Sequence, residues 1–255
     1  MTTTAPAPAA RRAPADSTRK TSFVAGMLYL ITFAASIPAV ALLSPVLNNP
    51  DYIISAGADT RVLWGCLLDV VNALAAIGTA VTLFPVVRRQ NEGLALGFVT
   101  TRLLEAAVVM IGVVSLLAIV TLRQDVAAGA GTDTASLVNT GHSLVAVRDW
   151  TLLLGPGLMP ALNALLLGSL MYRSRLVPRI IPTIGLVGAP LLLASVIATF
   201  FGVFGQFSTA ALFLALPVAA WEFSLGAWML VKGFKPAPIT RNLPPAAIHD
   251  AQPAL

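Results

Sequence analysis

Long apolar stretches separated by short polar segments make up most of this chain. A helix of about 20 apolar residues crosses the hydrocarbon core of a bilayer, so each stretch predicts a membrane-spanning helix. The predicted spans are residues 22–44, 61–87, 93–122, 140–172, 181–203 and 208–231. The pattern therefore predicts an all-α polytopic membrane protein, with six transmembrane helices in one bundle formed by residues 21–235.

Both ends of the chain differ from this apolar region. Residues 1–20 are rich in Thr, Ala and Pro, and residues 236–255 are rich in Pro and polar side chains. Such compositions cannot bury a core, so both ends are predicted to be disordered tails. The first apolar stretch could instead be a signal peptide, because Ala39-Val40-Ala41 resembles a cleavage site. Its length and the spans that follow favour a retained helix.

The connections between spans are short, except for residues 45–60 and 123–139, which are predicted as loops. Of the sixteen Lys and Arg residues, twelve lie in the two tails and in the turns after the second and fourth spans. Only Arg61 and Arg123 flank the spans on the opposite side. Because basic residues near span ends stay in the cytoplasm, both termini are predicted to be cytoplasmic and the protein to lie in the cytoplasmic membrane.

The third span carries two ionisable residues in its interior, Arg102 and Glu105. Residues three apart lie on the same face of a helix. A charge within the bilayer costs several kcal/mol unless it faces protein or a water-filled cavity. That face of the third span is therefore predicted to point into the helix bundle.

Other spans carry polar residues at similar depths. The predicted buried cluster comprises Asp69, Asn72, Arg102, Glu105, Arg148, Asp149, Asn163 and Glu222. At a rise of about 1.5 Å per residue, Asp69 and Glu105 lie at the depth of Arg148-Asp149. Arg102 and Glu222 lie nearer the midplane. We therefore expect one ion pair between Arg102 and Glu222, and another between Arg148 and either Glu105 or Asp69.

The acids in this cluster outnumber the bases. Four carboxylates accompany two guanidinium groups, so full ionisation would leave a buried charge of −2. A low-dielectric interior does not hold such an excess. Either one or two carboxyl groups keep a proton, or a cation occupies the cluster.

Composition excludes several functional classes. The chain is 57% hydrophobic and 11% charged, whereas soluble proteins are about 25% charged. The net charge of +5 comes from loops and tails and not from one face, so no nucleic-acid partner is expected. The single Cys66 lies in an apolar span and cannot form an intrachain disulfide.

The sequence contains no recognisable catalytic motif. It has no His-Glu-x-x-His, no Gly-x-Ser-x-Gly, no phosphate-binding loop and no cysteine cluster. We therefore expect no catalytic residues, no metal and no cofactor. A membrane-embedded enzyme acting on a lipid or isoprenoid is a weaker alternative, which a hydrated cavity converging on Asp69, Arg102 and Glu105 would favour.

Several separated segments resemble one family. They are LFPVVRRQNE at 83–92, ALG at 95–97, RLLE at 102–105, RDW at 148–150, YRSRLVPR at 172–179, and Glu222 ahead of KGF at 232–234. Together they resemble the bacterial membrane family catalogued as domain of unknown function 4386, over about residues 20–235. The resemblance implies a six-helix inner-membrane protein and draws attention to Arg102, Glu105, Arg148, Asp149 and Glu222. It supplies no activity.

Two functional hypotheses stay open. In the first and preferred one, the charges are structural or form an interface with another membrane protein or a second copy, and membrane lipids are the other partners. In the second, Asp69, Glu105 or Glu222 exchanges a proton or binds a cation in a small transporter or sensor. The Gly and Pro residues at 155–160 fit the second, because transporters use broken helices. A Pro kink is also ordinary in a spanning helix.

Overall fold

The computed structural model describes residues 15–55, 59–128 and 133–240, and these residues are helical or in turns, without a strand. The long helices are α1 (Ala15–Asn48), α2 (Thr60–Val87), α3 (Glu92–Ala127), α4 (Thr134–Leu152), α5 (Met159–Ser174), α6 (Ile180–Phe200) and α7 (Thr209–Val231). The short elements are the 3₁₀ helices η1 (Tyr52–Ile54) and η3 (Pro238–Thr240) and the π-helix η2 (Leu153–Gly157).

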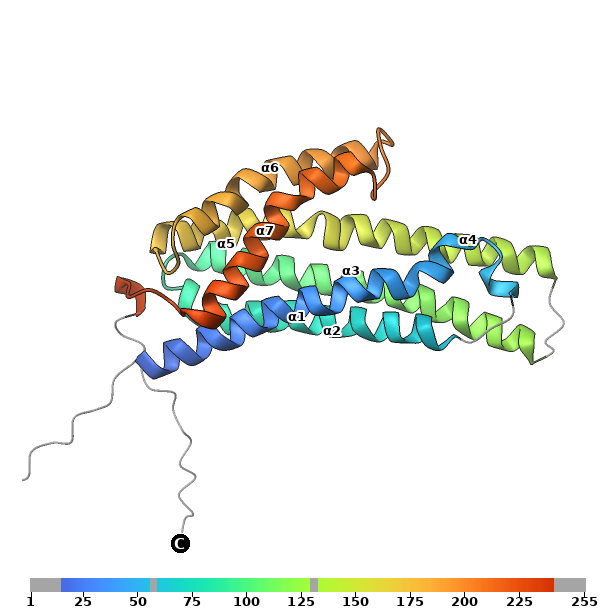
Figure 1. The fold of residues 1–255 in the computed structure, drawn as a ribbon, viewed down its shortest axis with the longest axis horizontal. Coiled ribbons are helices and arrows are strands. Elements are labelled where there is room, and N and C mark those ends of the chain that lie inside the picture. The colour runs from blue at the N-terminus through green and yellow to red at the C-terminus, as the bar shows by residue number, and fades with distance from the viewer. Residues whose placement is uncertain (1–14, 56–58, 129–132, 241–255) are drawn as a thin grey trace, which may run out of the picture.

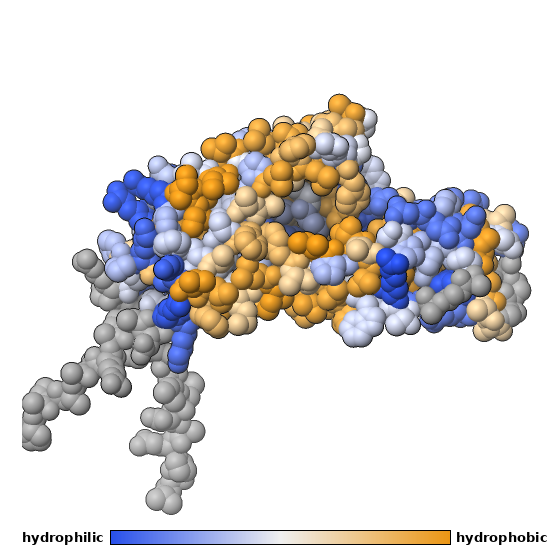
Figure 2. Space-filling model, in the orientation of Figure 1, coloured by the Kyte–Doolittle hydropathy of each residue, from blue (hydrophilic) through white to orange (hydrophobic). Residues whose placement is uncertain are grey.

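Six of the helical stretches in the described part of the chain are long and apolar enough to cross a membrane. Helices α4 and α5, joined by η2, make up one of these, Thr134–Ser174. Figure 2 shows a hydrophobic surface around the middle of the molecule and hydrophilic residues towards its ends. The predicted all-α membrane fold with six spans is therefore confirmed.

Several helices extend beyond the predicted spans. Helix α1 includes residues 15–20, which were predicted to belong to a tail, and it continues to Asn48. Most of the predicted loop 123–139 is also helical, because α3 continues to Ala127 and α4 begins at Thr134. Polar residues end an apolar stretch without ending a helix, so hydropathy marks the membrane boundary and not the helix terminus. The rest of the predicted tails, 1–14 and 241–255, lies outside the described residues.

The helices form a closed ring over much of the bundle. Helix α3 packs against α2 and α5, α5 packs against α6, and the α6–α7 hairpin returns to α1, which packs on α2. Helix α4 lies in line with α5 and packs on α3. It extends beyond the α6–α7 hairpin, so one end of the molecule consists of α1 to α4 (Figure 1). Helices α3 and α7 are not neighbours in this ring and face each other across its interior.

Glycines allow α1 and α7 to approach closely where they cross. A Cβ atom on Gly26 would lie 2.5 Å from the backbone nitrogen of Leu230, and one on Gly226 would lie 2.8 Å from Cβ of Tyr29. The hydroxyl of Ser22 donates to the carbonyl of Met229 at 2.8 Å. The hydrophobic effect does not drive helices together in lipid, so close van der Waals packing between small residues does so instead.

The described chain ends meet at one end of the bundle (Figure 1). Arg19 donates to the carbonyl of Val231 at 2.9 Å, and Arg89 reaches the carbonyl of Ile239 at 3.5 Å. The backbone nitrogen of Lys235 donates to the carbonyl of Leu176 at 2.7 Å. The turns after α2 and α5 therefore lie on the same side as both described ends, as six spans require.

Candidate functional site

The interior of the ring contains Arg102, which is only 2% exposed. Its Nη1 atom donates to Oε2 of Glu105 at 3.1 Å, one turn further along α3. Its Nη2 atom donates to Oε1 of Glu222 on α7 at 2.5 Å. The guanidinium thus bridges two carboxylates, and the second of these contacts is the ion pair expected from the sequence.

Asn163 on α5 completes the polar contacts of Glu105. Its amide nitrogen donates to Oε2 of Glu105 at 3.0 Å, the same oxygen that binds Arg102. The Asn163 carbonyl oxygen accepts from the Thr101 hydroxyl at 2.5 Å. Asn163 is fully buried. Its amide is therefore held from both sides, and Glu105 is fixed to α5 as well as to Arg102.

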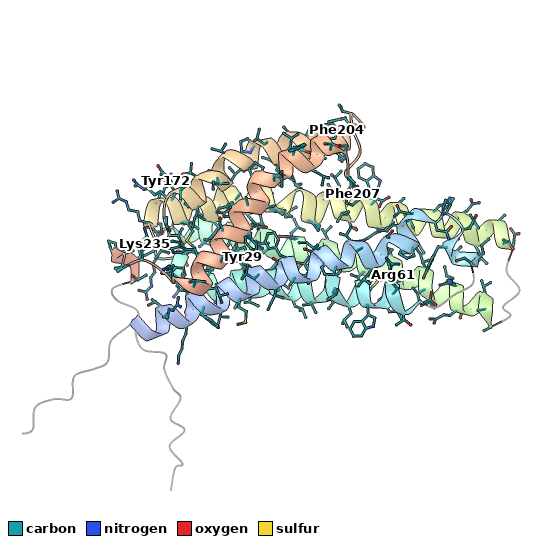
Figure 3. The ribbon with its side chains drawn as sticks, viewed as in Figure 1. Tyr29, Arg61, Tyr172, Phe204, Phe207 and Lys235 are labelled. Carbon is teal, nitrogen blue, oxygen red and sulfur yellow. The ribbon has the colours of Figure 1, made fainter. Side chains whose placement is uncertain are left out.

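Two aromatic rings flank the guanidinium of Arg102. Its Cζ atom lies 5.1 Å from the ring centre of Tyr29 and 5.9 Å from that of Phe98. Tyr29 lies on α1 where that helix meets α7 (Figure 3). The Tyr29 hydroxyl and Nε of Arg102 are buried without a hydrogen-bond partner among the described residues. Such groups are rare in folded proteins, and Nε and Nη1 of Arg148 are further examples among the described residues.

We call Tyr29, Arg102, Glu105, Asn163 and Glu222 the Arg102 cluster. It draws side chains from α1, α3, α5 and α7, which are four of the ring helices. Two carboxylates share one guanidinium, so the cluster carries an excess charge of −1 when both are ionised. A proton or a bound cation would neutralise that charge.

A second ion pair lies elsewhere in the bundle. Nη2 of Arg148 on α4 donates to Oδ2 of Asp69 on α2 at 2.6 Å, and both residues are buried. Gly112 on α3 makes room for it, since a Cβ atom there would lie 3.0 Å from Nη1 of Arg148 and 2.5 Å from the Thr151 hydroxyl. The Asp69–Arg148 pair is balanced in charge, unlike the Arg102 cluster.

The expectation that Glu105 lies in the layer of Asp69 and Arg148 is wrong. Gly112, which contacts Arg148, lies seven residues after Glu105, or about 10 Å further along α3. Glu105 instead shares a helix face with Arg102. The predicted depth of Glu105 assumes that the third span crosses within about 30 Å, whereas α3 has 36 residues and is about 54 Å long. The predicted fourth span begins at residue 140, whereas α4 begins at Thr134. The i,i+3 spacing depends on neither assumption.

Two residues of the predicted cluster lie outside both groups. Asp149 is exposed, although it directly follows the buried Arg148, and its backbone carbonyl accepts from the Gln206 amide at 2.9 Å. Asn72 is half-buried on α2, and no hydrogen bond joins its side chain to the described residues. Neighbours along a helix point about 100° apart, so the burial of Arg148 does not imply that of Asp149.

A third ionic contact was missed by sequence reasoning. Arg123, counted there as a boundary charge, is buried at the end of α3 and pairs with Asp59. Its Nη1 donates to the Tyr52 hydroxyl at 3.0 Å, and its Nε donates to the carbonyl of Ser55 at 2.9 Å. These bonds fasten the α1–α2 connection to α3. Burial and the hydrogen bond to Asp59 raise the pKa of Tyr52 to about 12.

A cavity of about 270 Å³ adjoins the Arg102 cluster. Its lining comes from α1, the end of α4, η2, α5, α6, the α6–α7 turn and α7, and it includes Glu222. Figure 2 shows a hollow in this region, framed by hydrophobic side chains. Asp69, Arg102 and Glu105 are not among the residues that line this cavity. Within the described residues, no group of three or more His, Cys, Asp or Glu side chains could hold a metal.

Comparison with known proteins identifies a family. Neither the curated proteins nor the solved structures contain a significant match to this chain. A family model does match residues 24–233, which include every member of the Arg102 cluster and the Asp69–Arg148 pair. The chain therefore belongs to the family described as Domain of unknown function (DUF4386).

Proposed function

We propose that this protein binds a small molecule or cation within the membrane and couples that binding to protonation of the Arg102 cluster, as a transporter or a sensor. The observation that carries this proposal is the position of Glu222. Its carboxylate belongs to a buried cluster with one acid in excess, and it also lines a cavity. Buried ionisable groups that meet such a cavity are typical of functional sites in membrane proteins.

The two buried ion pairs differ in a way that favours this function over a purely structural one. The Asp69–Arg148 pair is neutral and needs no further partner to balance its charge. The Arg102 cluster has two acids for one base. Both sites contain buried polar atoms without a hydrogen-bond partner among the described residues, which in the second pair are Nε and Nη1 of Arg148, so the charge balance is what separates the two sites. We assign the structural role to the Asp69–Arg148 pair and the binding role to the Arg102 cluster.

Protonation of Glu222 would change the packing of the ring. Helices α3 and α7 are not neighbours, and the bond from Arg102 to Glu222 joins them across the interior. The charged and polar groups around Glu222 are Tyr29, Arg102, Glu105 and Asn163. A proton on Glu222 would weaken its attraction to Arg102 and leave that guanidinium to Glu105, which loosens α7 from α3.

The π-helix η2 would serve as a hinge between α4 and α5. Its five residues form a π-helix between α4 and α5, and Pro156 and Gly157 line the cavity. π-helical turns within α-helices frequently occur at functional sites. Glu222 and η2 both line the cavity, so a movement of α7 or of η2 would change its shape.

The orientation of the protein belongs to the same proposal. The described chain ends and the turns after α2 and α5 lie at one end of the bundle, where most basic residues gather. Excess Lys and Arg mark the cytoplasmic side. Both termini would then be cytoplasmic, and the protein would lie in the inner membrane.

Labelling with dicyclohexylcarbodiimide, a lipid-soluble reagent that attacks protonated carboxyl groups, tests this proposal. The protein is labelled in lipid nanodiscs across a pH series, and the modified residue is identified by peptide mass spectrometry. We expect modification of Glu222 that rises as the pH falls and that is absent in Glu222→Gln. Glu92, exposed at the start of α3, is the internal control for reagent that acts from water. Lack of labelling at both Glu105 and Glu222 at every pH would contradict the proposal and favour a structural cluster.

A further inference from the structure

We infer that the cavity beside Glu222 binds a lipophilic organic monocation, an ammonium group on a compact apolar body, which enters from the bilayer. This inference rests on the proposed function and names the ligand class of the same site. It follows from the lining of the cavity, the charge of Glu222 and the way in which α7 leaves the space open.

The cavity walls are largely hydrocarbon. The apolar side chains around it include Leu192, Val196, Phe207, Leu212 and Val218. The hydroxyls of Ser195 and Thr199 and the amide of Gln206 are the polar groups that line it besides Glu222. A pocket with apolar walls and few polar groups suits a ligand with an apolar body and one polar end.

Small residues on one face of α7 create this space. Ala211, Ala215 and Ala219 follow one another at intervals of four residues, and Glu222 comes three residues later. Residues spaced by three or four share a helix face, so the three alanines lead along the cavity to the carboxylate. Larger side chains at these positions would fill the space that a ligand needs.

The free oxygen of Glu222 determines the charge of the ligand. Its Oε1 atom accepts from Arg102, whereas Oε2 accepts no hydrogen bond from the described residues. The side chain is 12% exposed, and it is one of the residues that line the cavity. An anion would be repelled here and a neutral molecule would leave the excess negative charge in place. A monocation removes that charge.

The surroundings of Glu222 favour an organic cation over a metal ion. Metal cations take several oxygen ligands in place of their water, and this cavity offers one free carboxylate oxygen among hydrocarbon walls. An alkylammonium needs fewer ligands because its apolar groups contact hydrocarbon. The rings of Phe33 and Phe207 also line the cavity, and aromatic faces attract organic cations.

A matched pair of ligands tests the charge requirement. Benzyltrimethylammonium and its neutral isostere neopentylbenzene have the same shape and differ in one charge. We expect the cation to raise the melting temperature of the protein in nanodiscs and to reduce carbodiimide modification of Glu222 by about tenfold near saturation. The neutral isostere should do neither, and Glu222→Gln should abolish the thermal shift.

A matched pair of variants tests the location. Ala219→Leu fills the cavity, whereas Ala220→Leu adds the same atoms to an exposed face of α7. We expect Ala219→Leu to lose the thermal shift caused by the cation and Ala220→Leu to keep it. Loss in both variants or in neither would overturn the location.

The outcomes separate this inference from the proposed function. If carbodiimide labels Glu222 in a pH-dependent way and benzyltrimethylammonium does not protect it, the inferred ligand class is wrong and the proposed function stands. Stabilisation by sodium or potassium chloride, but not by benzyltrimethylammonium, would lead to the same conclusion. Equal stabilisation by the cation and its neutral isostere would reject the charge requirement. Lack of labelling at Glu105 and Glu222 at every pH would refute the proposed function.

Discussion

The guanidinium of Arg102 and the carboxylate of Glu222 are joined at 2.5 Å although their helices, α3 and α7, are not neighbours in the ring. Glu105 holds the same guanidinium from its own helix at 3.1 Å. One basic group therefore connects opposite sides of the bundle and balances part of the charge of two acids. Arg102 therefore affects both the stability of the ring and the net charge beside the cavity.

Replacement of Arg102 should destabilise the protein more than replacement of either acid. Arg102→Met leaves two carboxylates buried without a counterion, which costs about 3–5 kcal/mol. Glu222→Gln removes the excess charge, and its amide oxygen can still accept from Arg102, so we expect a loss of less than about 1 kcal/mol. The measurement is the free energy of unfolding in mixed detergent micelles. The triple change Arg102→Met, Glu105→Gln and Glu222→Gln should recover part of the loss, and no recovery would show that Arg102 acts through packing and not through charge.

The Asp69–Arg148 pair should behave as a structural pair. Removal of either charge alone leaves the other buried and should cost about 3–5 kcal/mol. The double variant Asp69→Leu with Arg148→Met has no buried charge at this site, so it should be more stable than either single variant. Unfolding in mixed micelles gives the three free energies. Labelling of Glu222 by carbodiimide should be unchanged in the double variant, and a changed pH profile would contradict the separation of the two sites.

Sequence reasoning found the polar residues more reliably than their partners. The i,i+3 spacing of Arg102 and Glu105 places both on one face whatever the boundaries of α3, and the structure has them in contact. The pairing of Arg148 depends on how α4 is positioned along α3, on which it packs, and hydropathy does not give that position. The sequence therefore left both Glu105 and Asp69 as candidates. Asp69 is the partner because Arg148 meets α3 at Gly112, about 10 Å beyond Glu105.

The cavity and the Arg123 contacts carry weaker sequence signals. Ala211, Ala215 and Ala219 look like ordinary small residues of a spanning helix. They indicate a site only because Glu222 lies on the same helix face. Arg123 follows a long apolar stretch and looks like a boundary charge, because the position of its partner Asp59 depends on how the connection after α1 folds. Such long-range contacts follow from tertiary packing and not from local pattern.

Gly112 should not tolerate a side chain. In Gly112→Ala the new methyl group would lie 2.5 Å from the Thr151 hydroxyl and 3.0 Å from Nη1 of Arg148. The crowding would displace Arg148 from Asp69 and cost about 1–3 kcal/mol. Gly205→Ala is the matched control, since its Cβ would meet no atom within 4 Å. Both variants are compared by thermal unfolding, and equal melting temperatures would show that α3 and α4 can separate without losing the ion pair.

Ionisation of Tyr52 should weaken the fold at high pH. Its pKa is raised from 10.0 to about 12, mainly by burial and also by the hydrogen bond that its hydroxyl donates to Asp59. Between these two pH values the unfolded chain has lost the proton and the folded chain keeps it, so stability is fully present below pH 10 and is lost as the pH rises towards about 12. Phenolate absorbance, taken as wild type minus Tyr52→Phe, isolates this residue from the other tyrosines. A difference curve with its midpoint at pH 10 would mean that the Tyr52 hydroxyl is open to water, and that Arg123 and Asp59 do not close the α1–α2 connection over it.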